Sequence, residues 1–173
     1  MVARNAGGGE AFRNGVMRQW VFGLEVFLPD AAVMNDLKKV IKTNEGYEMK
    51  KMFIGSEGTL GIFTGFVLKL EPAIRDRQTI LAYTHNAVDS LSYLHWLCAA
   101  FGPKLLSVEI MWDDYFKAIS HGLGLDGRFG HLDGETYFIA DIDVPADDDS
   151  LLEILGKALE TGEITDVVIA KND

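Results

Sequence analysis

The feature that most constrains the fold is a glycine-rich stretch at residues 55–62, Gly-Ser-Glu-Gly-Thr-Leu-Gly-Ile, which leads into a predicted strand at 62–70. Glycine tolerates positive φ and leaves backbone N–H groups uncovered, so such a stretch can turn sharply and press its main chain against a polyanionic ligand. The spacing matches neither the Gly-x-Gly-x-x-Gly dinucleotide fingerprint nor a P-loop. A glycine-rich turn that only feeds a strand is therefore an equally open interpretation.

The size and composition are typical of a soluble globular protein. The chain has 173 residues, enough for one large or two small domains. No apolar run approaches the ~20 residues of a membrane span, and residues 1–5 lack the apolar segment of a signal peptide. Cys98 is the one cysteine, which excludes an intrachain disulfide and a cysteine-based metal site. We therefore expect a cytoplasmic protein.

Charge divides the chain into two parts. Residues 1–78 carry eleven Lys/Arg against nine Asp/Glu, a net of +2, whereas residues 79–173 carry five against seventeen, a net of −12. The acidic part would repel phosphates, so nucleic acid is not an expected partner. The change in composition predicts a domain boundary between residues 72 and 79.

The first part predicts a short β-rich segment. An apolar, β-branched run at 21–28 reads as a buried strand, with a hairpin return at 32–34 after Pro29 and Asp30. Residues 47–53 could form two helical turns. The strand at 62–70 would place Phe66, Leu68 and Leu70 on one face.

The second part predicts a β-α-β-β-α-β order. Strands are expected at 79–84, 105–110, 136–144 and 166–170, and helices follow Asn86 and begin at Ser150. A short helix at 112–119 and a loop at 122–134 separate the second and third strands. This order is the ferredoxin-like arrangement, in which two helices cover one face of a four-stranded antiparallel sheet. The fold class is therefore α+β.

The two main helices have predicted ends and faces. Asn86 should cap the first helix, which Gly102 and Pro103 end. Ser150 and Glu153 have the spacing of a capping box for the second, which Gly162 closes. The expected buried face of the first helix consists of apolar residues at helical spacing, namely Val88, Leu91, Leu94, Cys98 and Phe101.

Several segments together resemble one family. The strings Asn-Ala-Gly-Gly at 5–8, Gly-Leu-Glu-Val at 23–26, Asn-Glu-Gly-Tyr at 44–47 and Phe-Ile-Gly-Ser-Glu-Gly-Thr-Leu-Gly-Ile at 53–62 follow one another in order. They resemble the FAD-linked oxidases of the vanillyl-alcohol oxidase type. Within that family the similarity is to the D-lactate, glycolate oxidase subunit and D-2-hydroxyglutarate dehydrogenase branch.

The resemblance implies a fold, a cofactor and a site. Residues 1–72 correspond to the later half of a two-subdomain FAD-binding domain, and 79–173 to the beginning of a ferredoxin-like substrate or cap domain. Two segments are implied to contact FAD, and they contain Asn5, Ala6, Gly7, Glu57, Gly58, Thr59, Leu60, Gly61 and Ile62. The implied activity is oxidation of a small 2-hydroxy acid by hydride transfer to flavin.

The chain also departs from the family pattern. Arg4, Asn14 and Ala31 stand where the family usually has threonine, an aromatic residue and glycine. The family's pyrophosphate loop would precede residue 1, and its substrate arginine and metal site would follow residue 173, so we expect a middle piece of a longer enzyme. No residue is assigned as catalytic base. The alternative hypothesis is an inactive remnant that acts as an interaction module without FAD; in either case we expect a homodimer or a completing partner chain.

Two further motifs carry weak metal signals. His131 lies in a Gly-His string but has no partner histidine at ligand spacing. The run Asp147–Asp149 would need further oxygen ligands for calcium, and negative charge ahead of a helix N-terminus is favourable without any metal. No metal site is expected.

Overall fold

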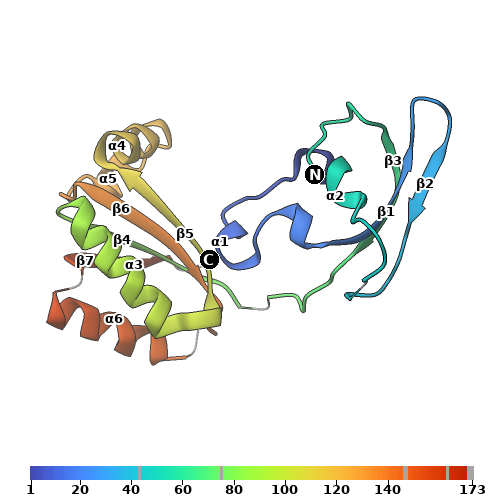
Figure 1. Ribbon diagram of the computed structural model, residues 1–173. Helices are drawn as coiled ribbons and strands as arrows, with labels where there is room; N and C mark the ends of the chain where they lie inside the picture. The colour runs from blue at the N-terminus through green and yellow to red at the C-terminus, as the bar shows by residue number, and fades with distance from the viewer. Residues whose placement is uncertain (43, 75, 146–147, 163, 171–173) are drawn as a thin grey trace. The chain divides into compact units, whose positions relative to one another are not determined.

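The computed structural model describes residues 1–42, 44–74, 76–145, 148–162 and 164–170. The chain divides into two compact units, Met1–Ala73 (unit 1) and Ile74–Asp173 (unit 2), each with its own core. Both units combine helices with antiparallel strands (Figure 1), which confirms the α+β class. Among the described helices, none is both long enough and apolar enough to cross a membrane.

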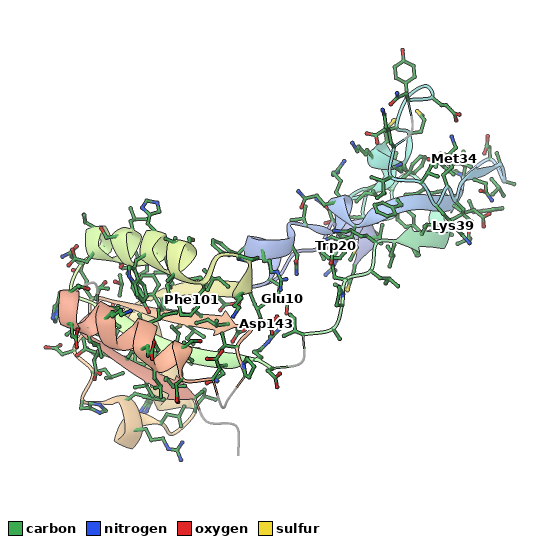
Figure 2. All side chains as sticks on the ribbon, turned by 90° about the horizontal axis from the view of Figure 1, so that it is seen from below. Glu10, Trp20, Met34, Lys39, Phe101 and Asp143 are labelled. Atoms are coloured by element: carbon green, nitrogen blue, oxygen red, sulfur yellow. The ribbon has the colours of Figure 1, made fainter. Side chains whose placement is uncertain are left out.

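Unit 1 is built on a three-stranded antiparallel sheet in the order β2-β1-β3. Its strands are β1 (Val21–Phe27), β2 (Val33–Asp36) and β3 (Ile62–Leu68). The predicted hairpin is present: the Ala31 N–H donates to the Leu28 carbonyl, and Asp30 Oδ1 accepts from the Ala32 N–H at 3.1 Å. Trp20 and Met34 lie toward opposite ends of β1 (Figure 2).

The core of unit 1 is small. One cluster holds its buried side chains, which are Val2, Val21, Leu24, Val26, Phe53 and Ile54. On β3, Phe66 and Leu68 share a face as predicted, but that face is exposed, and Phe63 packs on the core from the other side.

Short helical elements connect the strands of unit 1. They are η1 (Val2–Arg4), α1 (Ala11–Asn14), η2 (Met17–Gln19) and α2 (Lys50–Phe53). The prediction of two helical turns at 47–53 is wrong in length, because α2 has one turn and Ile54 is already extended. Tyr47 lies outside the helix and is 93% exposed.

Unit 2 is a four-stranded antiparallel sheet in the order β5-β6-β4-β7, with the predicted ferredoxin-like topology. The strands are β4 (Gln78–Thr84), β5 (Leu105–Trp112), β6 (Thr136–Ile142) and β7 (Asp166–Ala170). The helices are α3 (Ala87–Phe101), η3 (Gly102–Lys104), α4 (Asp113–Gly122), α5 (Asp126–Phe129) and α6 (Ser150–Thr161). Thus the predicted loop at 122–134 contains one helical turn, α5.

The two faces of the unit 2 sheet are covered differently. Figure 1 shows α3 and α6 together on one side of the sheet and α4 on the other. Side chains of a strand alternate between faces: Ile80, Ala82, Phe138 and Ala140 pack beneath α3 and α6, whereas Tyr137 packs with residues of α4 and α5. The main core therefore lies on the side of α3 and α6.

The predicted buried face of α3 is confirmed at Phe101, and in part at Cys98, which is half-buried against the core, but it is wrong at Val88 and Leu91. Val88 and Leu91 are 73% and 57% exposed, whereas Tyr93 and Leu97 are completely buried. Apolar residues occur around most of this helix, so helical spacing alone did not distinguish two possible stripes. The stripe that is buried also contains Ser90, and the Thr84, Ser90 and Thr136 hydroxyls form a closed hydrogen-bonded group between strands and helix.

The predicted N-cap of α3 is confirmed, and the capping box of α6 is wrong. Asn86 Oδ1 accepts from the N–H groups of Val88 and Asp89, both at 2.9 Å. On α6, Ser150 is already helical, the N-cap residue is Asp149, and the Ser150 N–H donates to Asp148 Oδ1 at 2.9 Å. Asp148, rather than Ser150, supplies the side-chain acceptor at the start of α6, and Asp149 makes no side-chain capping hydrogen bond.

The exposed and buried stripes of α3 should differ sharply in their effect on stability. Leu97→Ala should lower the free energy of unfolding by about 2 to 5 kcal/mol, because it removes a fully buried side chain. Leu91→Ala, on the exposed stripe, should change it by no more than about 0.5 kcal/mol. Urea denaturation followed by circular dichroism measures both values, and equal losses would contradict the assigned face.

Candidate flavin-binding segments and an apolar pocket

Main-chain hydrogen bonds hold the two predicted cofactor segments of unit 1 together. The Glu57 N–H donates to the Ala3 carbonyl at 2.8 Å, and the Gly55 N–H donates to the Val2 carbonyl at 3.3 Å. A Cβ atom at Gly55 would lie 3.4 Å from the Cβ of Asn5. The turn at Asn5 and the start of the 55–62 stretch are therefore direct neighbours, although Asn5 and Gly55 are 50 positions apart in the chain.

The 55–62 stretch is an irregular loop with left-handed backbone. Gly55 and Gly58 have φ of 89° and 83°, and Glu57, which has a side chain, has φ of 52°. A turn follows, in which both the N–H and the Oγ1 hydroxyl of Thr59 donate to the Ser56 carbonyl, at 3.0 and 2.6 Å. The loop thus ends α2 and reverses the chain before β3 begins.

The glycines at 58 and 61 serve different purposes. A Cβ at Gly58 would meet nothing within 4 Å, so this position is open and glycine is favoured by its positive φ. A Cβ at Gly61 would lie 2.6 Å from Val26 Cγ1 and 2.7 Å from the Phe27 carbonyl oxygen. Gly61 therefore lets the loop pack directly on β1, whereas Leu60 and Ile62 beside it are 42% and 69% exposed.

Arg18 contacts both the Asn5 turn and the end of α2, a role that the sequence did not predict. Its backbone N–H donates to Asn5 Oδ1 at 2.8 Å, and its guanidinium donates to the carbonyls of Lys51 and Ile54, both at 2.7 Å. The last carbonyls of a helix lack intrahelical partners, and arginine can satisfy them. The sequence shows that α2 needs such a partner but does not show which arginine reaches it.

Uncovered polar groups occur on both segments. Within the described part of the chain, no hydrogen bond is donated by the N–H groups of Gly7, Gly8, Gly58 or Leu60, and all four residues are exposed. The buried Ser56 Oγ likewise has no partner. Exposed N–H groups on left-handed and turn backbone favour anions and polar ring edges. The arrangement therefore fits a ligand such as FAD, which carries both.

The other predicted contact residues are placed differently. Ala6 uses both its main-chain groups within the protein, since its N–H donates to the Met1 carbonyl and its carbonyl accepts from the Met17 N–H. Asn5 has φ of 47°, and its side-chain oxygen is engaged by Arg18. These two residues shape the turn, and Gly7 next to them has the free N–H.

Unit 2 contains an apolar pocket on the open face of its sheet, which sequence reasoning also missed. The pocket has a volume of about 810 Å³. Leu81, Ile139 and Val168 form its floor, and Phe116 and Phe129 are among its walls on α4 and α5. The alternation of the strands predicts two faces, but the sequence does not show that an insertion between β5 and β6 folds over the second face.

Tyr137 anchors the wall of this pocket. Its ring stacks on Phe116 with centroids 3.9 Å apart, and its hydroxyl donates to the Leu132 carbonyl and accepts from the Gly134 N–H, both at 3.1 Å. Burial raises the pKa of the Tyr137 hydroxyl, and the Gly134 N–H partly opposes that rise. The neutral phenol therefore ties the segment after α5 to the sheet.

The weak metal signals do not gather into a site. Among the described residues, no three His, Cys, Asp or Glu side chains lie together as metal ligands would. His131 lines the apolar pocket, and Asp149 is the N-cap residue of α6. Asp147 lies outside the described residues.

Curated proteins similar to this chain are dehydrogenases and oxidases. Mitochondrial D-2-hydroxyglutarate dehydrogenase from Bos taurus is 36% identical over 124 residues, which cover 72% of this chain and 23% of that protein. D-lactate dehydrogenase from Archaeoglobus fulgidus is 43% identical over 47% of this chain and 18% of that protein. Glycolate oxidase subunit GlcD from Bacillus subtilis is 39% identical over 49% of this chain and 18% of that protein. The chain thus spans less than a quarter of the length of these relatives.

Solved structures agree on the fold. Alkyldihydroxyacetonephosphate synthase matches 96% of this chain and 33% of that chain with a TM-score of 0.65 and 12% identity. The match to glucooligosaccharide oxidase from Acremonium strictum covers 97% of this chain and 32% of the oxidase, with a TM-score of 0.51 and 17% identity. No protein-family model matches the chain.

Loss of the Arg18 guanidinium should loosen unit 1. Arg18→Gln removes two charge-assisted hydrogen bonds to carbonyls, and we expect a loss of about 1 to 3 kcal/mol in the free energy of unfolding. The matched control is Lys39→Gln, which removes an exposed positive charge elsewhere in unit 1. Urea titration of both variants measures the difference. Equal stability of the two variants would show that the Arg18 contacts do not hold the loop.

Proposed function

We propose that this chain is a member of the FAD-linked oxidases of the vanillyl-alcohol oxidase type and part of an FAD-dependent enzyme that oxidises a 2-hydroxy acid. Its similarity to D-lactate dehydrogenase, glycolate oxidase subunit GlcD and D-2-hydroxyglutarate dehydrogenase supports this proposal. The main support is the contact between the Asn5 turn and the 55–62 loop. In this proposal, residues 1–72 are the later part of an FAD-binding domain and 79–173 the beginning of a cap domain.

The residues of unit 1 have distinct tasks in this proposal. The exposed N–H groups of Gly7, Gly58 and Leu60 would donate to polar atoms of FAD, and Glu57, Thr59, Gly61 and Ile62 would complete the wall. FAD, when bound, supplies the two-electron acceptor for the α-hydrogen of the substrate. The chain's own contribution is to hold the loop in one shape, since left-handed backbone fixed in advance loses no conformational freedom on binding.

Location and assembly are part of the same proposal. We place the protein in the cytoplasm, although the relative from Bos taurus is mitochondrial. A homodimer or a completing partner chain is supported by apolar side chains exposed on unit 1 outside the two segments, among them Ile41 at 84% and Leu70 at 87%. Exposed apolar patches of this kind favour association.

Binding of FAD to the purified chain tests the proposal. The protein is mixed with FAD and desalted, and we expect a retained flavin absorption spectrum and quenched flavin fluorescence. Gly58→Val should weaken FAD binding at least about tenfold, because a branched side chain disfavours the left-handed backbone and covers the exposed N–H groups.

Gly46→Val is the matched control for this experiment. Gly46 also has positive φ, of 62°, and a Cβ there would also meet nothing within 4 Å, but it lies outside the two segments. The control should bind FAD within about twofold of the parent chain. A colourless parent protein, or equal weakening by both valines, would refute the proposed site and favour the inactive interaction module.

A further inference from the structure

The open face of the unit 2 sheet is ordered in rows across its strands. The strand pairing sets Leu81 opposite both Ile139 and Val168, so these three aliphatic side chains lie side by side on the pocket floor. The next row in one direction holds Thr79 and Asp141, which are paired with each other. The next row in the other direction holds Tyr83 and Tyr137, beneath the wall made by α4.

The acidic group beside the floor is already satisfied. Asp141 accepts hydrogen bonds from Thr79 Oγ1 at 2.6 Å, Ser107 Oγ at 3.0 Å and Arg77 Nη1 at 3.3 Å. Its negative charge is thus compensated by protein groups and does not need a ligand cation. This side of the pocket floor offers no attraction for a second charged group.

Among the described residues that line this pocket, Arg128 is the one Lys or Arg. Lys117 pairs with Asp113 and Arg77 with Asp141, as expected in a segment with so many carboxylates. The Arg128 side chain lines the apolar pocket from α5 and is exposed. Across the described residues it has neither an ion pair nor a side-chain hydrogen bond, although residues 79–173 carry seventeen Asp and Glu against five Lys and Arg.

We propose that this pocket binds a linear monocarboxylate with an apolar chain, its carboxylate on Arg128 and its chain along Leu81, Ile139 and Val168. The pocket volume of about 810 Å³ lies within the ~300–1,000 Å³ of small-molecule sites. Arginine offers a planar fork of donors that matches a carboxylate. A fully apolar ligand would leave the guanidinium unmatched, and a dicarboxylate would place its second charge on aliphatic side chains at a desolvation cost.

The aliphatic floor of the pocket also determines how the binding affinity depends on the chain length of the ligand. Each methylene buried on the aliphatic floor should tighten binding about fourfold. Decanoate should therefore bind about 16-fold more tightly than octanoate. The proposal concerns unit 2 alone and is measured without flavin, so its outcome is independent of the FAD experiment.

Isothermal titration of the full 173-residue chain with decanoate, octanoate and decan-1-ol tests the site. Arg128→Gln should weaken decanoate about tenfold and change decan-1-ol by less than about twofold, since only the carboxylate contact is lost. Lys157→Gln is the matched control, because Lys157 is an exposed cation on α6, across the sheet from the pocket. It should leave both affinities unchanged.

A second variant tests the floor separately. Ile139→Trp should fill the pocket and weaken decanoate and decan-1-ol alike by more than about tenfold; if circular dichroism shows that it is unfolded, Val168→Phe takes its place. Absence of decanoate binding to the parent chain would overturn the proposal. Decanoate affinity that is unchanged in Arg128→Gln, or unchanged in the folded floor variant, would overturn it equally.

Discussion

The shape of unit 1 depends on two main-chain hydrogen bonds, from Glu57 to Ala3 and from Gly55 to Val2. They join the first turn of the chain to the loop that follows α2, and they form over a long sequence separation in a unit with a small core. Closing such a long loop costs conformational entropy. Arg18 offsets part of this cost because it binds both segments at once, through its backbone at Asn5 and its guanidinium at Ile54.

Unit 2 follows a different constraint, the alternation of side chains across one sheet. Phe138 and Ala140 face α3 and α6, whereas Tyr137 and Ile139 face the opposite side. In an ordinary two-layer α+β domain the second face would be solvated and polar. Here it carries aliphatic and aromatic residues, and the α4–α5 segment covers only part of them. The same pattern of residues therefore produces a closed core on one face and an open apolar pocket on the other.

The sequence predicted the helices and strands of this chain better than the tertiary contacts between them. Strands rich in β-branched and aromatic residues, such as β4 and β6, and the Asn86 cap follow from local preferences that tertiary contacts did not override. The buried face of α3 does not follow from such local preferences, because packing against the sheet decides whether the stripe with Leu91 or the stripe with Leu97 is buried. The loop at 55–62 was identified from its string of residues, but the Arg18 contacts that hold it depend on tertiary proximity, which no local pattern contains.

The glycines at 58 and 61 are required for two different physical reasons, which the spacing of the glycines alone does not show. Gly58 has positive φ at an open position, where glycine is favoured by its backbone conformation. A residue that tolerates this conformation could in part replace it. Gly61 is required for a steric reason, since a Cβ would overlap Val26 and Phe27 on the neighbouring strand. A loop made only to turn would need the first glycine, and a loop made only to pack would need the second. Both together produce a turn that is fixed against the sheet while its N–H groups remain exposed, which is the property that a cofactor wall requires.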